Sequence, residues 1–422
     1  MVTMMDQLPE MYRLRQIFPR PRVNDIPAAV MKELDKLHLS RSIEPGQKIG
    51  ITAGSRGIQN LGSILKTVID QVRSLGASPR VLAAMGSHGG GTERGQKEVL
   101  DSLLLNEEVL GAEVVTCAEC EIIARTGEGL PVFTVGSATA VDGIIVVNRV
   151  KTHTSFKGKV ESGLVKMLVV GLGGPKGAQQ FHGFGPEELP RLLVEIGEVI
   201  LQKLPVLGGL GIVENAYEET AAVQAITARG MIEEEGAQLR YSKSLMPSLP
   251  ADKIDLLIIQ EMGKNFSGTG IDTNIIGRAR IHGVPEPTCP RIKRIAVLDL
   301  SDESHGNATG VGMADFVTRT LVEKMDRKAT YLNCLTSTFV VRAAIPMYFE
   351  TEKELLEAAL YSLSSIPREE LRVVIVPNTL FLTDCYVSKA VAGELQGKKD
   401  VEIANEPEQL TFSDAGRILL RI

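Results

Sequence analysis

The chain has 422 residues and a formal net charge of −6, with 44% hydrophobic and 23% charged residues. This length predicts two or three domains, and the composition is that of globular proteins. The acidic balance argues against nucleic acid as the main partner. No apolar run reaches the roughly 18–20 residues of a membrane span, and the N-terminus lacks the apolar core of a signal peptide. We therefore expect a cytoplasmic enzyme or binding protein with no membrane partner.

The five cysteines are an odd number and do not form the pattern of a disulfide framework. Cys117 and Cys120 form a CxxC pair, but no second pair lies at the spacing of a zinc site. We interpret both as small structural residues beside a strand.

The first half of the chain alternates short apolar runs with helical patterns. After a lead segment of loop and short helix (residues 1–45), residues 48–52 predict a buried strand and residues 60–75 a helix. Residues 79–84 predict the next strand, and Thr92 caps the helix that follows. Two successive β-loop-α units favour a parallel sheet, whose loops meet at the carboxyl edge where open α/β sheets bind ligands.

Three side chains with chemical potential follow the ends of predicted strands. Arg56 follows the first strand, His88 lies in the glycine-rich turn after the second, and His153 follows a third strand at 141–150. We expect them to converge at one edge of the sheet. An arginine at a helix N-terminus suits a phosphate or carboxylate, and a histidine can hold or release a proton near neutral pH.

The stretch from Val150 to Phe184 carries the most unusual residue pattern. His153 and His182 flank an apolar run that Lys166 interrupts. A lysine in such a run costs free energy unless it is paired or used chemically. The chain lacks the ligand spacing of a zinc site, the GxSxG elbow of a hydrolase and the GxxxxGK[ST] of a P-loop.

The second half restarts as α/β after a proline- and serine-rich boundary at 241–252. A glycine- and asparagine-rich loop at 261–280 lies in this half, and such loops are usually functional. Residues 218–236, just before the boundary, predict a mixture of turn and helix. The elements expected in the second half are strands at 254–260, 294–300 and 371–376, and helices at 311–325 and 355–363.

Taken in order, four motifs resemble those of the nickel-pincer-nucleotide lactate racemase family and its 2-hydroxyacid racemase and epimerase relatives. The motifs are ITAGSRGI, AAMGSHGGGT, the stretch from Lys151 to His182, and KNFSGTGIDTNIIGR. The resemblance spans most of the chain. It implies two α/β domains with largely parallel sheets, 1–245 binding the cofactor and 250–422 closing over the substrate, with the active site in the cleft between them.

The resemblance also implies an activity and a cofactor. The activity is isomerisation (racemisation or epimerisation) of a small-molecule 2-hydroxy acid by reversible hydride transfer. The cofactor is the nickel-pincer nucleotide, Ni(II)-pyridinium-3,5-bisthiocarboxylic acid mononucleotide, which cofactor-synthesis enzymes supply. Cofactor electronics perform the difficult step, and the protein orients the reactants and balances charge.

Residue roles follow from the same resemblance. His88 and His153 correspond to the acid/base pair, and His182 to the nickel ligand. Lys166 corresponds to the lysine that holds the cofactor covalently, because its spacing to His182 matches the family; Lys176 is a rival for that role.

The cofactor-contacting turn corresponds to Ala53, Gly54, Ser55 and Arg56. This turn begins with aspartate in the lactate enzyme, and the alanine found here leaves lactate in doubt as the substrate.

Residues Asp272, Asn274, Arg278 and Arg280 match the second-domain segment that closes on the substrate. The lactate enzyme uses a lysine there, and the nearest cations in this chain are Arg278 and Arg280. Since arginine can grip a carboxylate through two hydrogen bonds, a larger or doubly charged hydroxy acid fits this loop.

Two other classes of function remain open from the residues. One is a non-catalytic nucleotide- or metal-binding protein, and the other a conventional metal-dependent hydrolase or lyase on the same scaffold. A homodimer also remains open, because one chain shows no interface.

Overall fold

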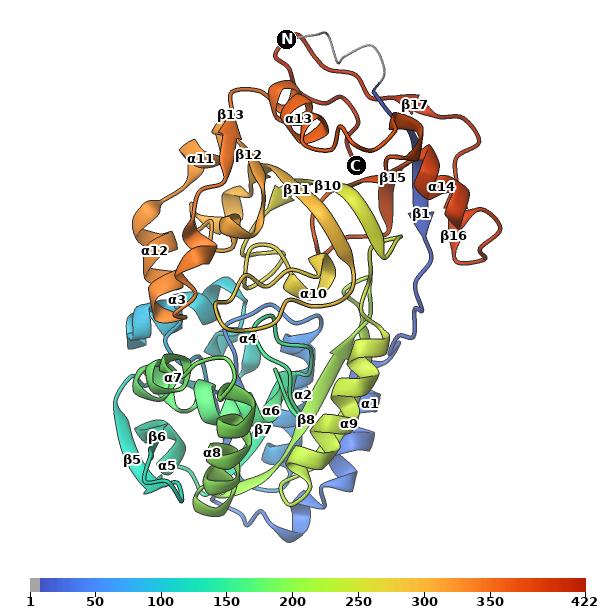
Figure 1. Cartoon of the computed structure of the whole chain (residues 1–422). Coiled ribbons are helices and arrows are strands. Elements are labelled where there is room, and N and C mark those ends of the chain that lie inside the picture. The colour runs from blue at the N-terminus through green and yellow to red at the C-terminus, as the bar shows by residue number, and fades with distance from the viewer. Residues whose placement is uncertain (1–7) are drawn as a thin grey trace. The chain divides into compact units, whose positions relative to one another are not determined.

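The computed structural model describes residues 8–422 and divides the chain into two compact units. One unit is Arg20–Met246, and the other combines residues up to Pro19 with Pro247–Ile422. Both are mixed α/β units, so the expected fold class of two α/β domains with largely parallel sheets is confirmed (Figure 1). The junction after Met246 lies within the expected boundary at 241–252, while residues 1–7 of the expected first domain lie outside the described residues.

The Arg20–Met246 unit is built on a six-stranded sheet in the order β4-β3-β2-β7-β8-β9. All neighbouring pairs in this sheet are parallel except β8 and β9. The strands, in spatial order, are β4 (Glu113–Val115), β3 (Ser78–Ala83), β2 (Lys48–Ala53), β7 (Gly143–Arg149), β8 (Val206–Glu214) and β9 (Thr220–Thr227). The neighbouring parallel arrangement of β3, β2 and β7 is the one expected from the repeated strand-loop-helix pattern.

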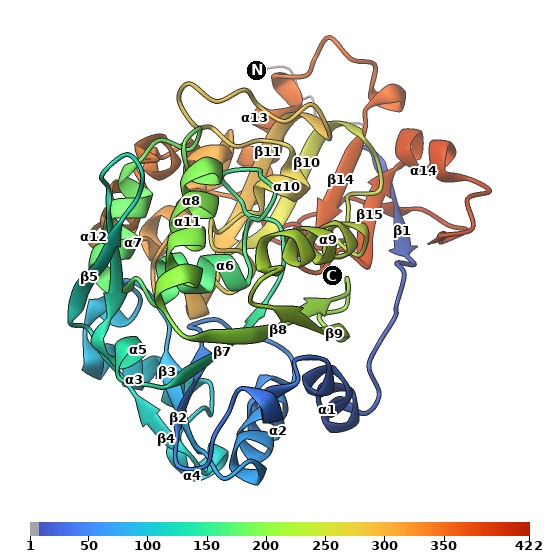
Figure 2. The ribbon, with the colours of Figure 1, turned by 90° about the horizontal axis from the view of Figure 1, so that it is seen from below.

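Helices cover both faces of this sheet. Successive side chains of a strand point to opposite faces, so a continuous apolar strand contributes buried side chains to a core on each face. Ile145 belongs to the core on one face and Ile144 to the core on the other. Figure 2 shows the sheet between the two helix layers. The first layer holds α1 (Ile26–Lys36), α2 (Leu61–Ser74), α3 (Glu93–Ser102) and α4 (Glu107–Leu110), and the second holds α6 (Leu164–Lys166), η3 (Met167–Gly171), α7 (Gly174–Gly183), α8 (Leu189–Lys203) and α9 (Met231–Ser244).

Local sequence signals account for the first helices of this unit. The apolar positions expected at helical spacing in α2 are all buried. Thr92 caps α3 as expected, its hydroxyl oxygen accepting from the amide of Gly95 at 3.1 Å. The remaining short elements are η1 (Leu39–Arg41), η2 (Gly89–Gly91), α5 (Gly136–Thr139) and a separate hairpin of β5 (Cys120–Arg125) and β6 (Pro131–Val135).

The prediction of turn and helix over residues 218–236 is wrong for residues 220–227. Residues Thr220–Thr227 form β9, which pairs antiparallel along β8. Pairing with a neighbouring strand overrides the weak local preference of this alanine-containing segment.

The second unit is built on a nine-stranded sheet in the order β13-β12-β11-β10-β14-β15-β1-β16, with β17 also paired to β1. Its first five strands run parallel and the remainder antiparallel. The strands are β13 (Met347–Phe349), β12 (Phe316–Thr318), β11 (Arg291–Leu300), β10 (Lys253–Met262), β14 (Val373–Val376), β15 (Asp384–Ser388), β1 (Glu10–Gln16), β16 (Val401–Ile403) and β17 (Glu408–Gln409). The helices are α10 (Thr273–Ile276), α11 (Arg319–Lys324), α12 (Arg327–Thr336), α13 (Glu352–Tyr361) and α14 (Lys389–Leu395), with short turns η4 (Asp302–Ser304), η5 (Val311–Met313), η6 (Val340–Ala343) and η7 (Arg368–Glu370).

Two expectations for this unit are corrected. The helix expected at 311–325 is instead η5, then strand β12, then α11. Phe316 and Val317 are buried between β11 and β13, and Thr318 ends the strand and caps α11 through Leu321. Short apolar runs such as Phe316-Val317 fit a buried strand and a buried helix equally well, so the sequence pattern alone does not distinguish the two.

The second correction concerns the N-terminal lead segment. Residues 10–16, expected as loop in the first domain, form β1, which pairs with β15 and β16 of the other unit. Met11 and Leu14 are fully buried there. Its partners lie more than 350 residues away in sequence, so local pattern could not reveal the pairing. Among residues 8–422, no helix is both long enough and apolar enough to span a membrane.

Candidate functional site

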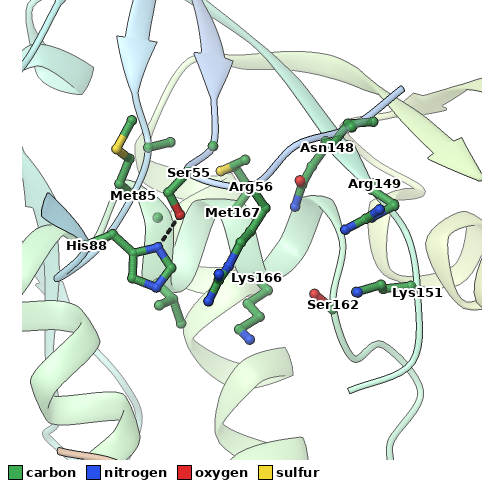
Figure 3. A pocket seen from close by; sticks show the side chains of 15 residues that line it. Ser55, Arg56, Met85, His88, Asn148, Arg149, Lys151, Ser162, Lys166 and Met167 are labelled. Atoms are coloured by element: carbon green, nitrogen blue, oxygen red, sulfur yellow. Dashed lines mark hydrogen bonds between the residues drawn. The ribbon is translucent and has the colours of Figure 1, made fainter. Parts of the chain in front are cut away.

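The loops after β2, β3 and β7 surround a cavity of about 150 Å³ at the carboxyl edge of the sheet (Figure 3). This is the edge at which open α/β sheets bind ligands. Its polar lining residues are Ser55, Arg56, His88, Asn148, Arg149, Lys151, Ser162 and Lys166. The expected convergence of Arg56 and His88 is therefore present, and Lys166 joins them.

The turn that carries His88 is anchored on the segment that carries Lys166. Gly86 has φ +58°, and a Cβ there would lie 2.9 Å from the carbonyl oxygen of Val170. Its amide donates to the carbonyl oxygen of Gly171 at 3.0 Å. Only glycine fits both the left-handed backbone and the close approach, so this residue determines how closely the two segments pack.

Lys166 ends α6, and the chain continues through η3, a π-helical turn, into α7. Single π-turns within helices are rare and are frequent at functional sites. The residue is half-buried. Burial, together with the positive charges of Lys151 and Arg56, lowers the pKa of Lys166 to about 7. A substantial fraction of the amine is thus neutral and nucleophilic near neutral pH.

His182 lies in the last turn of α7 and is half-buried. Burial and, to a lesser extent, the charge of Lys166 lower the pKa of His182 to about 4. The ring is therefore neutral at neutral pH, the state in which imidazole binds a metal.

His88 is exposed and its Nδ1 forms a hydrogen bond with the hydroxyl of Ser55, as the dashed line in Figure 3 marks. A hydroxyl can donate or accept, so this contact permits either neutral tautomer of His88. Ser55 comes from the loop after β2 and His88 from the loop after β3. The hydrogen bond joins the two loops at the cavity.

His153 does not line the cavity but lies in the loop that follows Lys151. Its Nδ1 accepts from the amide of Ser155 at 3.1 Å, so the neutral ring carries its proton on Nε2. The ring stacks on Phe156, with centroids 4.2 Å apart. Phe156 meets Phe181 edge-on at 6.3 Å, and Phe181 meets His182 at 5.5 Å. A row of aromatic contacts thus connects the two histidines.

The cavity carries an excess of positive charge. Arg56, Arg149, Lys151 and Lys166 line it. Arg149 forms an ion pair with Glu214, and a carboxylate oxygen of Glu218 lies 3.8 Å from its guanidinium. An anionic ligand is therefore favoured here.

Sequence reasoning missed two of these cations, Arg149 and Lys151. The signal was available, because both lie at the end of the same predicted strand that leads to His153.

Four of the first-unit residues named from the sequence do not line the cavity: His153, His182, Ala53 and Lys176. Ala53 is the buried last residue of β2 and packs in the core among the first helix layer, while its neighbour Gly54 lines the cavity. Lys176, the rival of Lys166, is exposed in the first turn of α7.

The expected substrate loop belongs to the second unit, where its side chains have local partners. Asp272 caps α10 and accepts from the backbone and side-chain amides of Asn274, both at 2.9 Å. Arg278 donates to the carbonyl oxygen of Met313 at 2.8 Å and pairs with Asp315 at 2.9 Å. Arg280 pairs with the other oxygen of Asp315 at 3.1 Å. Substrate contacts by these four residues stay a prediction.

Among solved structures, the chain is similar to the lactate racemase apoprotein from Thermoanaerobacterium thermosaccharolyticum. The TM-score is 0.53 at 14% identity, covering 87% of this chain and 99% of the racemase chain. The chain has a lactate-racemase-like fold. No protein-family model and no curated protein matches its sequence. At this identity the similarity establishes the fold, and the residue roles rest on the geometry of the site.

Proposed function

We propose that this protein is an isomerase that racemises or epimerises a 2-hydroxy acid, with a nickel-pincer nucleotide held at the cavity. One observation carries the proposal: Lys166, with a pKa lowered to about 7, lies in the same cavity as His88 and Arg56. The lactate-racemase-like fold supports an isomerase.

The side chains present fit that cofactor in three respects. A Lys166 amine that is substantially neutral near neutral pH suits a covalent bond to an acyl or thioacyl carbon. The neutral ring of His182 suits nickel. Arg56 and Lys151 suit the phosphate of a nucleotide. Among the described residues no group of three or more His, Cys, Asp or Glu could hold a metal, so nickel at His182 would take its other ligands from the bound group.

In this mechanism Lys166 would tether the cofactor and His182 would ligate its nickel. When bound, the cofactor supplies a reversible hydride acceptor for the hydrogen on the α-carbon of the substrate. The histidines handle the hydroxyl proton: one ring nitrogen accepts it as the acid becomes a planar 2-keto acid, and a histidine returns it afterwards. His88 can adopt either tautomer, whereas the Nδ1 of His153 is held as an acceptor.

Mass spectrometry tests this function. The protein is produced together with the cofactor-synthesis enzymes, and its intact mass, its peptides and its nickel content are measured. An adduct on the Lys166 peptide, about one nickel per chain and racemisation of one member of a panel of 2-hydroxy acids are expected. Lys166→Ala should lose the adduct, and Lys176→Ala serves as the matched control that keeps it.

The other outcomes separate the alternatives. An unmodified mass under these conditions would overturn the proposal. An adduct on Lys176 would move the tether and leave the activity assignment intact. Adduct and nickel without turnover of any acid would favour the non-catalytic nucleotide- or metal-binding protein, and zinc or iron without an adduct would favour a conventional hydrolase or lyase.

A further inference from the structure

A buried carboxylate, Glu161, lies between the His153 loop and α6 and has no solvent exposure. Its oxygens accept from the backbone amides of His153 at 2.7 Å and Gly158 at 3.4 Å. The amines of Lys243 and Lys157 lie 2.8 and 3.6 Å away. A buried charge is costly unless it is paired and hydrogen-bonded, and these four donors meet that requirement.

These contacts determine the shape of the loop that carries His153. Glu161 accepts a hydrogen bond from the backbone amide of His153, and the amine of Lys157 donates to the backbone carbonyl oxygen of His153 at 2.8 Å. The loop in turn orients the ring, through the Ser155 amide at Nδ1 and the face of Phe156. The contacts within the loop therefore orient the His153 ring, and the hydrogen bonds of Glu161 hold the loop in this conformation.

Helix α9 contacts both this loop and the helix that carries Lys166. Lys243, near the end of α9, binds Glu161. Glu235, about two turns earlier on the same helix, accepts from the amide of Val165 at 2.8 Å, at the start of α6. The same rigid element thus connects His153 and Lys166 through two buried carboxylates.

We propose that Glu161 is a positioning residue: held by Lys243 of α9, it fixes the ring of His153 relative to Lys166. This inference rests on the proposed function in the sense that His153 must act on the substrate for the position of its ring to affect turnover. The position of the ring itself can be measured without any activity.

The test combines histidine NMR with kinetics on the full-length chain. In protein with labelled histidine, the His153 ring signals are assigned by their loss in His153→Gln. Glu161→Ala should shift or broaden these signals and lower kcat by about 10- to 100-fold with KM nearly unchanged, because a displaced catalytic group costs rate at that scale. Glu161→Gln keeps an oxygen that can accept from the His153 amide and should restore much of both.

Two further variants complete the design. Lys243→Met removes the partner from α9 and should move the ring signals in the same direction, to a smaller extent. Glu233→Gln is the matched control, since Glu233 lies on the exposed side of α9 and pairs with Lys159 at the surface. It should change neither signals nor kcat.

Unmoved His153 signals in a folded Glu161→Ala protein would overturn the inference. If that variant does not fold, unmoved signals in Lys243→Met have the same consequence. Shifted ring signals in a chain that turns over no hydroxy acid would support the positioning role and contradict the proposed function, so the two failures are distinguishable.

Discussion

Lys166 and His182 show how one environment can prepare two different groups. Burial makes both lose their protons more easily, and the cations around Lys166 act in the same direction. One becomes a nucleophilic amine near neutral pH and the other a neutral imidazole. Neither property is visible in the residue names, although a lysine inside an apolar run was a fair signal for the first.

Amine-selective acylation measures the state of Lys166 directly. At neutral pH an acylating reagent should modify Lys166 faster than the exposed Lys176, which is the control. The rate at Lys166 should rise as the pH increases through about 7, because only the neutral amine reacts. Arg56→Gln removes a nearby positive charge and should move this midpoint upward. Peptide mapping against pH gives the Lys166 midpoint in the native chain and in Arg56→Gln, and a native midpoint well above 7 would contradict the lowered pKa.

Arg278 and Arg280 differ in the exposure of their side chains and in the number of hydrogen bonds that each guanidinium makes. The Arg278 side chain is 13% exposed and its guanidinium bonds to three backbone carbonyl oxygens and to Asp315. The Arg280 side chain is 39% exposed and its guanidinium pairs with Asp315. We expect Arg278→Met to lower the free energy of unfolding by about 2–4 kcal/mol, because it removes the guanidinium donor from partly buried carbonyl oxygens and weakens the pairing of Asp315. Arg280→Met should cost under about 1 kcal/mol. Urea unfolding of both variants checks the difference, and equal losses would refute it.

At the scale of elements, the cavity depends on how the loop after β3 packs against the π-helical turn η3. The sequence predicted the strand, the glycine-rich turn and the neighbouring helix, because each has a local signature. The π-helical turn was beyond prediction, since no local sequence signature marks it, and its close approach to Gly86 joins segments about 80 residues apart.

Gly86→Ala tests that approach. The added Cβ meets the Val170 carbonyl oxygen at 2.9 Å on a left-handed backbone, so we expect a loss of about 2–3 kcal/mol. Gly90 is the matched control, because it also has positive φ but nothing lies within 4 Å of its Cβ position. Gly90→Ala should lose only about 1 kcal/mol. Denaturant unfolding of the two variants isolates the cost of close contact, and equal losses would argue against it.

Glu235, the buried carboxyl group on α9 that accepts from the Val165 amide, should make the stability of the fold depend on pH. Burial raises its pKa to about 7, while its hydrogen bonds from the Val165 and Leu164 amides act in the opposite direction. Because the folded pKa exceeds the unfolded value of about 4.5, the folded state favours the protonated acid. This contribution is complete below pH 4.5 and is lost as the pH rises through 7, by on the order of 3 kcal/mol.

Comparing Glu235→Gln with the native chain at pH 5 and pH 8 measures this effect. The native protein should lose about 2–3 kcal/mol more of its unfolding free energy between the two pH values than the variant does. Glu233→Gln, on the same helix but at the surface, should behave like the native chain. A native protein and Glu235→Gln with the same pH dependence would show that Glu235 stays ionised.

At the scale of the whole molecule, local pattern predicted the α/β character of both halves of the chain and the parallel orientation of β3, β2 and β7. It failed at β1, β9 and β12. Each of these strands is short or weakly patterned and is stabilised by partners that local pattern cannot identify, β1 by partners more than 350 residues away. The loops that meet at a strand end were predictable, but Glu161 and Glu235 were not, because nothing in a surface-type residue signals that it is buried.

Residues 20–246 contain the whole six-stranded sheet, both helix layers and every residue that lines the cavity. A fragment of this range should therefore fold cooperatively and keep the fast acylation of Lys166. A fragment starting at residue 247 lacks β1, which lies between β15 and β16, and should be less stable than the same range produced with residues 8–19 fused to it. Circular dichroism during urea unfolding compares the three, and an unfolded 20–246 fragment would contradict the expectation.

The position of β1 has a consequence for how the chain is made. Residues 10–16 are synthesised about 370 residues before their partner β15. At a synthesis rate of about 5–20 residues per second, this strand waits roughly 20–70 s for its neighbour. During that time residues 20–246 can complete their own sheet. β1 can therefore pair only after β15 has been made, and the nascent polypeptide must keep the apolar side chains of Met11 and Leu14 from wrong partners until then.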